Sequence, residues 1–166
     1  MKRILFICTG NTCRSPMAEG FMRAALKNDR ELSSRFITSS AGISAYPGDH
    51  ASRHSMDVML SEWKIDISSH AACPLNEKEV SDAFLILTMT RHQKEYITSE
   101  YPEAKVKTYT LKEFARDRQV GNYYSQDYSS IPDITDPYGK PLHIYSRCAG
   151  EIKEAVDKLV DIIKKS

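Results

Sequence analysis

A thiol and a guanidinium stand six positions apart in the segment Cys8-Thr9-Gly10-Asn11-Thr12-Cys13-Arg14-Ser15-Pro16. A cysteine reacts as its thiolate, and the planar fork of an arginine can bind two oxygens of a phosphoryl group at once. Gly10 allows the chain to curl, and Asn11 can fix the curl through side-chain-to-backbone hydrogen bonds. The spacing therefore predicts a nucleophile, Cys8, in a loop that binds an anion together with Arg14.

The elements on either side place this loop at the start of a helix. Residues 4–7 form a continuous apolar run, typical of a parallel strand that is buried on both faces. Ser15 can cap the helix that follows and Pro16 suits its first turn, while Ala18, Phe21 and Met22 begin an amphipathic repeat. A helix start presents unpaired N–H groups and a partial positive charge. We therefore expect Cys8 to be mostly thiolate at neutral pH, with the Ser15 hydroxyl as a donor to its sulfur.

The rest of the chain alternates strand and helix patterns. Strands are predicted at residues 36–40, 83–87 and 106–109, and helices at 76–82, from Thr90 to about 101, and at the carboxyl end, where apolar residues recur from 152 to 163. Met56, Met59, Leu60 and Trp63 mark another helix, which a core face explains better than a cofactor site. This alternation predicts an α/β fold with a parallel sheet. Residues 117–135 lack a period and are interpreted as a long loop.

Composition bounds the class of protein. At 166 residues the chain is expected to form a single domain, residues 1–166, with 41% hydrophobic and 27% charged residues. A formal net charge of +1 gives no reason to expect nucleic acid or a membrane as partner, and no apolar stretch is long enough for a membrane span or signal peptide. Cys73 and Cys148 stand alone, so neither a disulfide framework nor a metal site is expected. A reactive thiol suits a reducing compartment, which predicts a cytoplasmic protein.

The loop and its context resemble a known family. Cys-x5-Arg-Ser after a first strand is similar to the low-molecular-weight protein tyrosine phosphatases, and the full version, Cys-Thr-Gly-Asn-Thr-Cys-Arg-Ser-Pro-Met-Ala-Glu, resembles the bacterial protein arginine phosphatase branch most. The similarity continues through Ser40-Ala41-Gly42, His70, residues 85–89 and Asp136-Pro137. The resemblance implies a four-stranded parallel sheet flanked by helices on both faces, with the phosphate loop after the first strand. It also implies phosphorylated proteins as substrates, inorganic phosphate or another oxyanion in the loop, and no cofactor.

The resemblance assigns further site residues. Transfer of phosphate to a cysteine needs an acid for the leaving group and then a base for water, and one carboxylate can do both. Asp136 matches the family's general acid, and Pro137 stiffens its turn; from the residues alone it is one of 22 acidic side chains. Asp133 can brace this turn. Tyr138 is expected as an aromatic wall, the alternative being an ordinary half-buried loop tyrosine.

The remaining expectations concern the loop and its support. Catalysis is assigned to Cys8, Arg14 and Asp136, and Ser40 and His70 match positions that steady the loop through Asn11, the alternative being turn and surface residues. The residues expected around the phosphate are Thr9, Gly10, Asn11, Thr12, Cys13, Ser15 and Tyr138. Cys13 can also form a reversible disulfide with Cys8, unless it is simply a small buried thiol.

The residues expected at the rim of the site indicate which phosphorylated side chain is the substrate. Tyrosine-specific relatives usually carry an aliphatic residue where Thr12 stands and a second aromatic residue where Gly139 stands. Thr12 can bond a guanidinium or position water, so these two residues favour phosphoarginine, with a strict tyrosine phosphatase as the alternative. An arsenate reductase would need two further cysteines after the central strand, where the sequence has none. A phosphate-binding module without chemistry is disfavoured because Cys8, Arg14 and Asp136 are all present.

Overall fold

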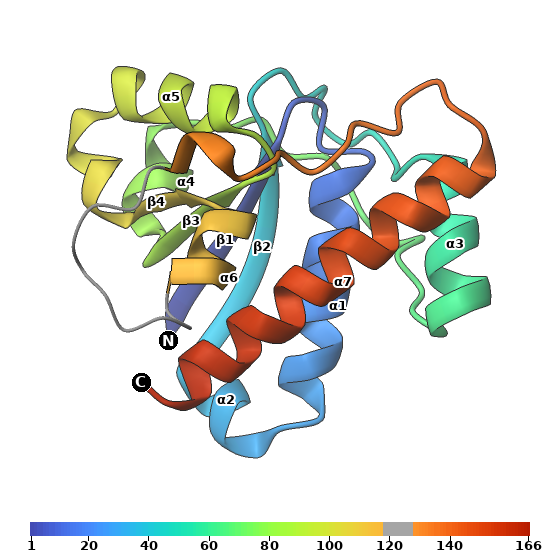
Figure 1. Ribbon diagram of the computed structural model, residues 1–166, viewed down its shortest axis with the longest axis horizontal. Coiled ribbons are helices and arrows are strands. Elements are labelled where there is room, and N and C mark those ends of the chain that lie inside the picture. Colours follow the sequence, from blue (N-terminus) through green and yellow to red (C-terminus); the bar gives the residue numbers. More distant parts are fainter. Residues whose placement is uncertain (118–127) are drawn as a thin grey trace.

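The computed structural model describes residues 1–117 and 128–166, and in this part of the chain four parallel strands form one sheet (Figure 1). The strand order is β2-β1-β3-β4, so β1 is an inner strand with β2 and β3 as neighbours. In chain order the elements are β1 (Lys2–Cys8), α1 (Arg14–Lys27), α2 (Arg30–Arg35), β2 (Phe36–Gly42), α3 (Arg53–Trp63), α4 (Glu77–Asp82), β3 (Leu85–Thr88), α5 (Arg91–Glu100), the 3-10 helix η1 (Pro102–Lys107), β4 (Thr108–Thr110), α6 (Leu111–Asp117), the 3-10 helix η2 (Tyr128–Ser130) and α7 (Leu142–Lys164). The predicted α/β fold with a four-stranded parallel sheet is confirmed.

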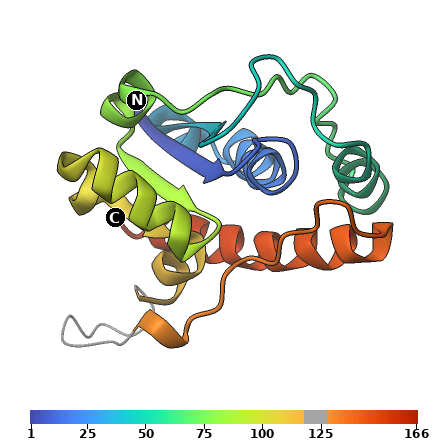
Figure 2. The ribbon, with the colours of Figure 1, turned by 90° about the horizontal axis from the view of Figure 1, so that it is seen from above.

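Helices cover both faces of the sheet, as the apolar run in β1 requires (Figure 2). Ile4 and Phe6 point to the face that is covered by α1 and α7, whereas Leu5 and Ile7 point to the face that is covered by α4 and α5. All four side chains are fully buried. Alternate residues of one strand therefore supply the centres of two separate cores, which fixes the position of the strand end that leads into the loop.

The long carboxyl-terminal helix α7 runs beside α1 across one face of the molecule (Figure 1). Its buried stripe includes Ile152, Val156, Leu159 and Ile163, the spacing that predicted an amphipathic helix. α7 begins at Leu142, six residues after Asp136 in the chain. Packing of α7 on α1 thus ties the segment that carries Asp136 to the helix that follows the phosphate loop.

Some element boundaries differ from the prediction. β3 begins at Leu85 instead of residue 83. Phe84, just before it, is half exposed and bonds to β1 only through its backbone N–H, which donates to the carbonyl of Arg3. β4 begins at Thr108, because the preceding residues form a 3-10 helix that leaves Val106 exposed. Leu60 was expected on the core face of α3 and is exposed.

Two short helices were missed. In α2, six residues long, the Asp29 carboxylate accepts a hydrogen bond from Leu32 N and caps the first turn. In α6, Thr110 and Glu113 cap each other's backbone N–H groups, as in a capping box. Of the predicted loop 117–135, residues 118–127 lie outside the described residues; residue 117 ends α6 and residues 128–130 form η2.

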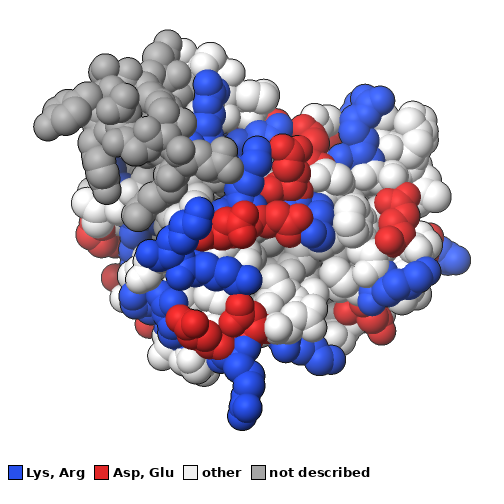
Figure 3. Space-filling view, turned by 60° about the horizontal axis from the view of Figure 1, so that its bottom comes forward, with Lys and Arg blue, Asp and Glu red and all other residues white. Residues whose placement is uncertain are grey.

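The loops that follow β1, β2 and β3 meet the segment before α7 at the carboxyl edge of the sheet, and both chain termini lie at the opposite end (Figure 1). On the face seen in Figure 3, acidic and basic side chains are interspersed, in keeping with a formal net charge of +1. Among the described helices, none has the length and apolar character to cross a membrane.

Candidate active site

The phosphate loop, residues 8–15, runs from the last residue of β1 into the first turn of α1. Pro16 lies in that first turn, as predicted, but Ser15 is not the cap: the capping position is Cys13, which makes no side-chain hydrogen bond to the helix. The Ser15 side chain is buried and its hydroxyl lies 2.9 Å from Cys8 Sγ. The prediction that Ser15 caps the helix was therefore wrong, because its hydroxyl faces the sulfur. That contact with the sulfur was the other prediction for Ser15.

A chain of hydrogen bonds aims donors at the Cys8 sulfur. Asn11 Nδ2 donates to Ser15 Oγ over 2.8 Å, so the Ser15 hydrogen remains free to point at Cys8 Sγ. The Asn11 backbone N–H also points at Cys8 Sγ, at 3.3 Å. Two donors therefore face the sulfur, an arrangement that suits a nucleophile which reacts as an anion.

Asn11 connects the loop to three residues outside it, one in β2 and two in the segment 70–73. Its backbone has a φ of 55°, in the left-handed region that asparagine tolerates better than most residues, and its side chain is fully buried. Nδ2 donates to Ser40 Oγ at 2.9 Å, and Oδ1 accepts from Cys73 N at 2.8 Å. His70 Nε2 lies 2.7 Å from the Asn11 carbonyl oxygen, which can only accept, so this nitrogen carries a hydrogen. Ser40 and His70 thus contact Asn11 as expected.

The end of β2 approaches the loop so closely that only glycine fits. A Cβ atom on Gly42 would lie 2.6 Å from the carbonyl oxygen of Thr9 and 2.9 Å from Asn11 Cβ. The backbone carbonyls of Cys8 and Thr9 accept hydrogen bonds from the two residues after Gly42, at 3.1 and 2.9 Å. The sequence Ser40-Ala41-Gly42 therefore forms a backbone support for the loop.

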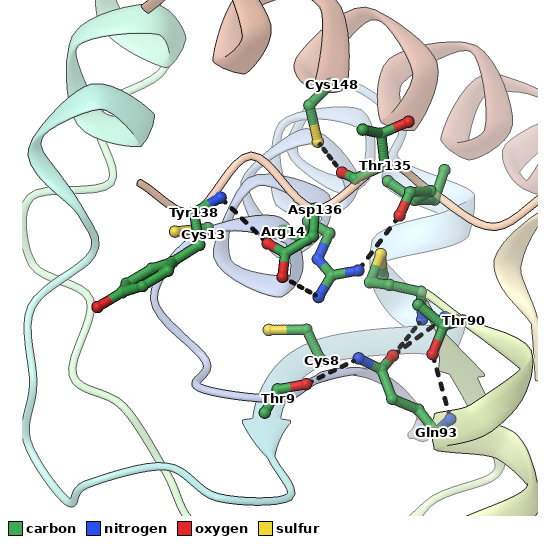
Figure 4. Close-up of polar contacts among 12 residues, drawn as sticks. Cys8, Thr9, Cys13, Arg14, Thr90, Gln93, Thr135, Asp136, Tyr138 and Cys148 are labelled. Carbon is green, nitrogen blue, oxygen red and sulfur yellow. Dashed lines mark hydrogen bonds and ion pairs between the residues drawn. The ribbon is translucent and has the colours of Figure 1, made fainter. Parts of the chain in front are cut away.

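Arg14 connects the phosphate loop to the segment that carries Asp136 (Figure 4). The guanidinium is buried; Nη1 donates to the carbonyl of Ile134 over 3.2 Å, and Nη2 lies 3.5 Å from Asp136 Oδ2. The Asp136 side chain is 58% exposed, and its other oxygen accepts from Tyr138 N at 3.1 Å. A buried cation and a solvent-accessible carboxylate thus face each other across the site.

The acid loop, residues 133–139, is fastened at its base. Asp133 Oδ1 accepts from Arg91 N at 2.8 Å, and Ile134 N donates to the carbonyl of Met89 over 3.0 Å. The Cys148 thiol donates to the carbonyl of Thr135 over 3.4 Å. Burial, with a smaller effect of nearby Glu151, raises the pKa of Cys148 to about 12, so this thiol remains a donor at neutral pH.

The phosphate loop and the acid loop together surround one hollow of about 250 Å³. Tyr138 lies at the rim of this hollow and is 76% exposed, so it is more exposed than the half-buried loop tyrosine that was the alternative. Asn11 and Ser15, which were expected around the phosphate, are fully buried residues of the loop and do not line the hollow. The lining residues are Cys8, Thr9, Gly10, Thr12, Cys13, Arg14, Asp136 and Tyr138. Within the described ranges, no group of three or more His, Cys, Asp or Glu side chains could bind a metal ion.

Comparison with known proteins places the chain in a family. The family model described as low molecular weight phosphotyrosine protein phosphatase matches residues 3–166. The chain belongs to this family. It is therefore a cysteine-dependent phosphatase that acts on phosphorylated proteins, as the sequence predicted.

The relatives include both substrate classes. A protein-arginine-phosphatase of Geobacillus stearothermophilus is 36% identical over 159 residues, which make up 96% of this chain and 94% of the relative. The solved structure of the YwlE arginine phosphatase from that organism is similar with a TM-score of 0.84 at 34% identity, over 99% of this chain and 94% of that chain. A solved low molecular weight protein tyrosine phosphatase from T. tengcongensis is similar with a TM-score of 0.82 at 39% identity, over 97% and 99%.

The second cysteine of this phosphatase's loop has a partner that the sequence did not indicate. Cys13 Sγ lies 3.5 Å from the hydroxyl of Tyr145 on α7, and both residues are buried. Burial and this contact raise the pKa of Tyr145 to about 12. Cys8 and Cys13 are both free thiols.

Sequence reasoning missed other residues that support the phosphatase site. Gln93 Nε2 donates to Thr9 Oγ1 over 3.2 Å, and Glu19 accepts from the Ser40 hydroxyl at 2.5 Å. Thr90 and Gln93 form a capping box, and that pattern is visible in the sequence. The contact to Thr9 is not visible, because it joins positions 84 residues apart.

Proposed function

We propose that this enzyme removes phosphate from phosphoarginine in proteins through a cysteinyl phosphate on Cys8. The observation that carries the proposal is that Cys8, the Arg14 guanidinium and the Asp136 carboxylate line one small hollow at the end of the central strands. Nucleophile, oxyanion partner and proton donor are thereby within reach of one phosphoryl group.

In the first step the Cys8 thiolate attacks phosphorus. The new S–P bond forms as the bond from phosphorus to the substrate nitrogen breaks, and Asp136 gives its proton to that nitrogen. Arg14 binds two of the phosphoryl oxygens with its planar fork, and backbone N–H groups of the loop bind the negative charge. The exposed position of Asp136 suits this role, because the leaving group departs toward solvent.

In the second step water releases the phosphate. Asp136, now ionised, takes a proton from water as its oxygen attacks phosphorus, and the S–P bond breaks to return the thiolate. The Ser15 hydroxyl and the Asn11 N–H donate to the departing sulfur. Ser40 and His70 support this step indirectly, because they fix the conformation of Asn11.

The rim favours phosphoarginine. Thr12 lines the hollow, and its hydroxyl is a group that can bond an entering guanidinium. Gly139 has a φ of 72°, which strains any residue with a side chain, so the turn itself disfavours a second aromatic ring there. The relative from Geobacillus stearothermophilus, described as a protein-arginine-phosphatase, is consistent with this choice.

Phosphotyrosine is the second candidate substrate. Tyr138 is largely exposed at the rim, where an aromatic ring can stack on a phenyl group. The similar structure from T. tengcongensis is described as a tyrosine phosphatase. The predicted loop 117–135 contains three tyrosines that could add aromatic contacts to a phenyl group, and two of them fall in residues 118–127, outside the described residues.

The test compares kcat/KM for phosphoarginine and phosphotyrosine peptides of the same sequence. We expect the wild type to prefer phosphoarginine, and Thr12→Ile to shift the ratio by about tenfold toward phosphotyrosine, because a hydroxyl is replaced by an aliphatic surface. Thr12→Ser, which keeps the hydroxyl, is the matched control. Equal losses on both peptides in Thr12→Ile would remove Thr12 as the selector, and a wild-type preference for phosphotyrosine would reject the proposed substrate.

The place of action follows from the chemistry of the thiol. A cysteine that must stay reduced to react works best in a reducing compartment, so we place the enzyme in the cytoplasm. Its partners there would be phosphorylated proteins, with inorganic phosphate as the product that occupies the loop.

A further inference from the structure

The side chain of Gln93 lies between α5 and the phosphate loop, and its orientation is fixed by its partners (Figure 4). Its Oε1 accepts hydrogen bonds from two backbone N–H groups, those of Met89 and Thr90, each at 3.0 Å. Backbone N–H groups can only donate, so the amide cannot be flipped. Gln93 Nε2 therefore carries the hydrogens that face Thr9 Oγ1 at 3.2 Å.

This contact determines what the Thr9 hydroxyl can do. A hydroxyl has one hydrogen to donate and two lone pairs to accept with. One lone pair of Thr9 Oγ1 is used by Gln93, which is the sole partner of that oxygen within the described residues. The hydrogen of Thr9 must then point elsewhere, and Thr9 is an exposed residue that lines the hollow beside Cys8.

Gln93 is anchored firmly enough to impose this orientation. It is 3% exposed, and its own N–H donates to Thr90 Oγ1 over 3.2 Å. The turn before it also bonds to the acid loop through Met89 O and Arg91 N, at 3.0 and 2.8 Å. The start of α5 is thus fastened to both loops of the site, so Gln93 cannot follow a movement of the Thr9 side chain.

We propose that Gln93 is a positioning residue that makes the Thr9 hydroxyl a hydrogen-bond donor to the oxyanion bound over Cys8. The inference rests on the proposed function, because it requires an oxyanion at that place. Thr9 then adds a side-chain donor to the backbone donors of the loop, and Gln93 acts only through it.

The experiment measures competitive inhibition by inorganic phosphate in the hydrolysis of p-nitrophenyl phosphate. Thr9→Val removes the donor and should raise the inhibition constant about tenfold, as expected for one hydrogen bond to a charged group. Thr9→Ser keeps the hydroxyl and should stay within about twofold of wild type. If Thr9→Val binds phosphate as tightly as wild type, the hydroxyl is no donor and the proposal fails.

Gln93→Glu tests the positioning step. The carboxylate can still accept from Met89 N and Thr90 N, but its second oxygen now takes the Thr9 hydrogen away from the hollow. We expect an increase of about tenfold in the inhibition constant, and less than about twofold when the same change is made in the Thr9→Val background. Thermal unfolding of each variant confirms that it is folded.

A matched control separates this step from simple charge repulsion. His92 is exposed in the same turn, so His92→Glu, compared with His92→Gln, adds a carboxylate without contact to Thr9. An equal effect of His92→Glu, or an undiminished effect of Gln93→Glu in the Thr9→Val background, would overturn the proposal. A wild-type enzyme that neither turns over the ester nor binds phosphate would overturn the proposed function and this inference together.

Discussion

The phosphate loop and the acid loop face each other across one hollow, but they are built differently. In the phosphate loop, Asn11 and Ser15 are fully buried and bonded to β2, to the segment at residue 73 and to each other. In the acid loop, the Asp136 side chain is 58% exposed and Tyr138 is 76% exposed. The acid loop is fastened to the rest of the protein at its base, through residues 133–135, whereas its exposed tip meets the phosphate loop through the ion pair between Asp136 and Arg14.

The difference separates two tasks. A nucleophile has to be held in a fixed relation to the phosphoryl group, which a buried and fully bonded loop provides. An acid has to meet leaving groups that differ between protein substrates, which an exposed carboxylate on a fastened base allows. Changes in the phosphate loop should therefore damage fold and chemistry together, whereas changes in the acid loop should affect chemistry with little effect on stability.

The largest effect is expected at Cys8. Cys8→Ser should lower turnover by about 10³-fold or more, because a neutral hydroxyl is a poor nucleophile under this loop. Phosphate affinity should stay within about threefold of wild type, because Arg14 and the loop backbone remain. Steady-state rates and phosphate binding by calorimetry measure the two quantities. Full turnover in Cys8→Ser would mean that another residue receives the phosphate.

The next effect is expected at the tip of the acid loop. Asp136→Asn cannot protonate the leaving nitrogen, so kcat on a phosphoarginine peptide should fall by about 10²-fold or more. The loss should be smaller on p-nitrophenyl phosphate, whose leaving group needs no proton, and thermal stability should be unchanged. If Asp136→Asn equals wild type on the poorer leaving group, the acid is a different residue.

The same comparison explains what the sequence could predict. The phosphate loop is contiguous, and its strand-loop-helix context is a local signal, so Cys8, Arg14 and the contact of Ser15 with the sulfur were predicted from neighbouring residues. Ser40, His70 and Tyr138 needed a family resemblance, because in their local sequence they look like ordinary turn or surface residues. Asp136 was indicated by its Asp-Pro-aromatic context together with the resemblance.

The remaining features could not be read because their partners are distant in the chain. Gln93 meets Thr9, and Cys13 meets Tyr145, over 84 and 132 positions. The strand boundaries near Phe84 and Val106 were misplaced because these apolar residues are exposed, and an exposed apolar residue cannot be told from a buried one in the sequence. By contrast, the capping box of Thr110 and Glu113 is a local pattern that is visible in the sequence and indicates a helix start, although no helix was predicted there.

A third prediction tests whether the phosphate loop couples fold to chemistry. Gly42→Ala places a Cβ 2.6 Å from the Thr9 carbonyl oxygen, so the loop backbone must shift. We expect a loss of about 1–3 kcal/mol in the free energy of unfolding, as for other overpacked sites, and a fall in kcat of about tenfold. Urea denaturation and steady-state kinetics measure both.

Gly150→Ala is the control for that substitution. No atom lies within 4 Å of the Cβ that it would add on α7, so the free energy of unfolding should rise by up to about 1 kcal/mol through helix propensity. Its activity should match wild type. If Gly42→Ala behaves in the same way, the close approach of β2 does not constrain the loop.

The smallest effect is expected at the base of the acid loop. Cys148→Ala removes the hydrogen bond from its thiol to the Thr135 carbonyl, which should cost about 1 kcal/mol of unfolding free energy and less than about threefold in kcat. The same thiol gives the stability a pH dependence. The pKa of Cys148 is raised to about 12 in the folded enzyme against a reference value of 9.0, because burial disfavours the thiolate. The neutral thiol's contribution is therefore complete below pH 9 and declines as the pH rises from 9 toward 12, where only the unfolded chain ionises readily. The stability difference between wild type and Cys148→Ala, measured by denaturation at several pH values, should narrow over that range. A difference that stays constant with pH would show that the thiol ionises equally in both states, and a large loss of kcat would show that the acid loop is as sensitive to its contacts as the phosphate loop.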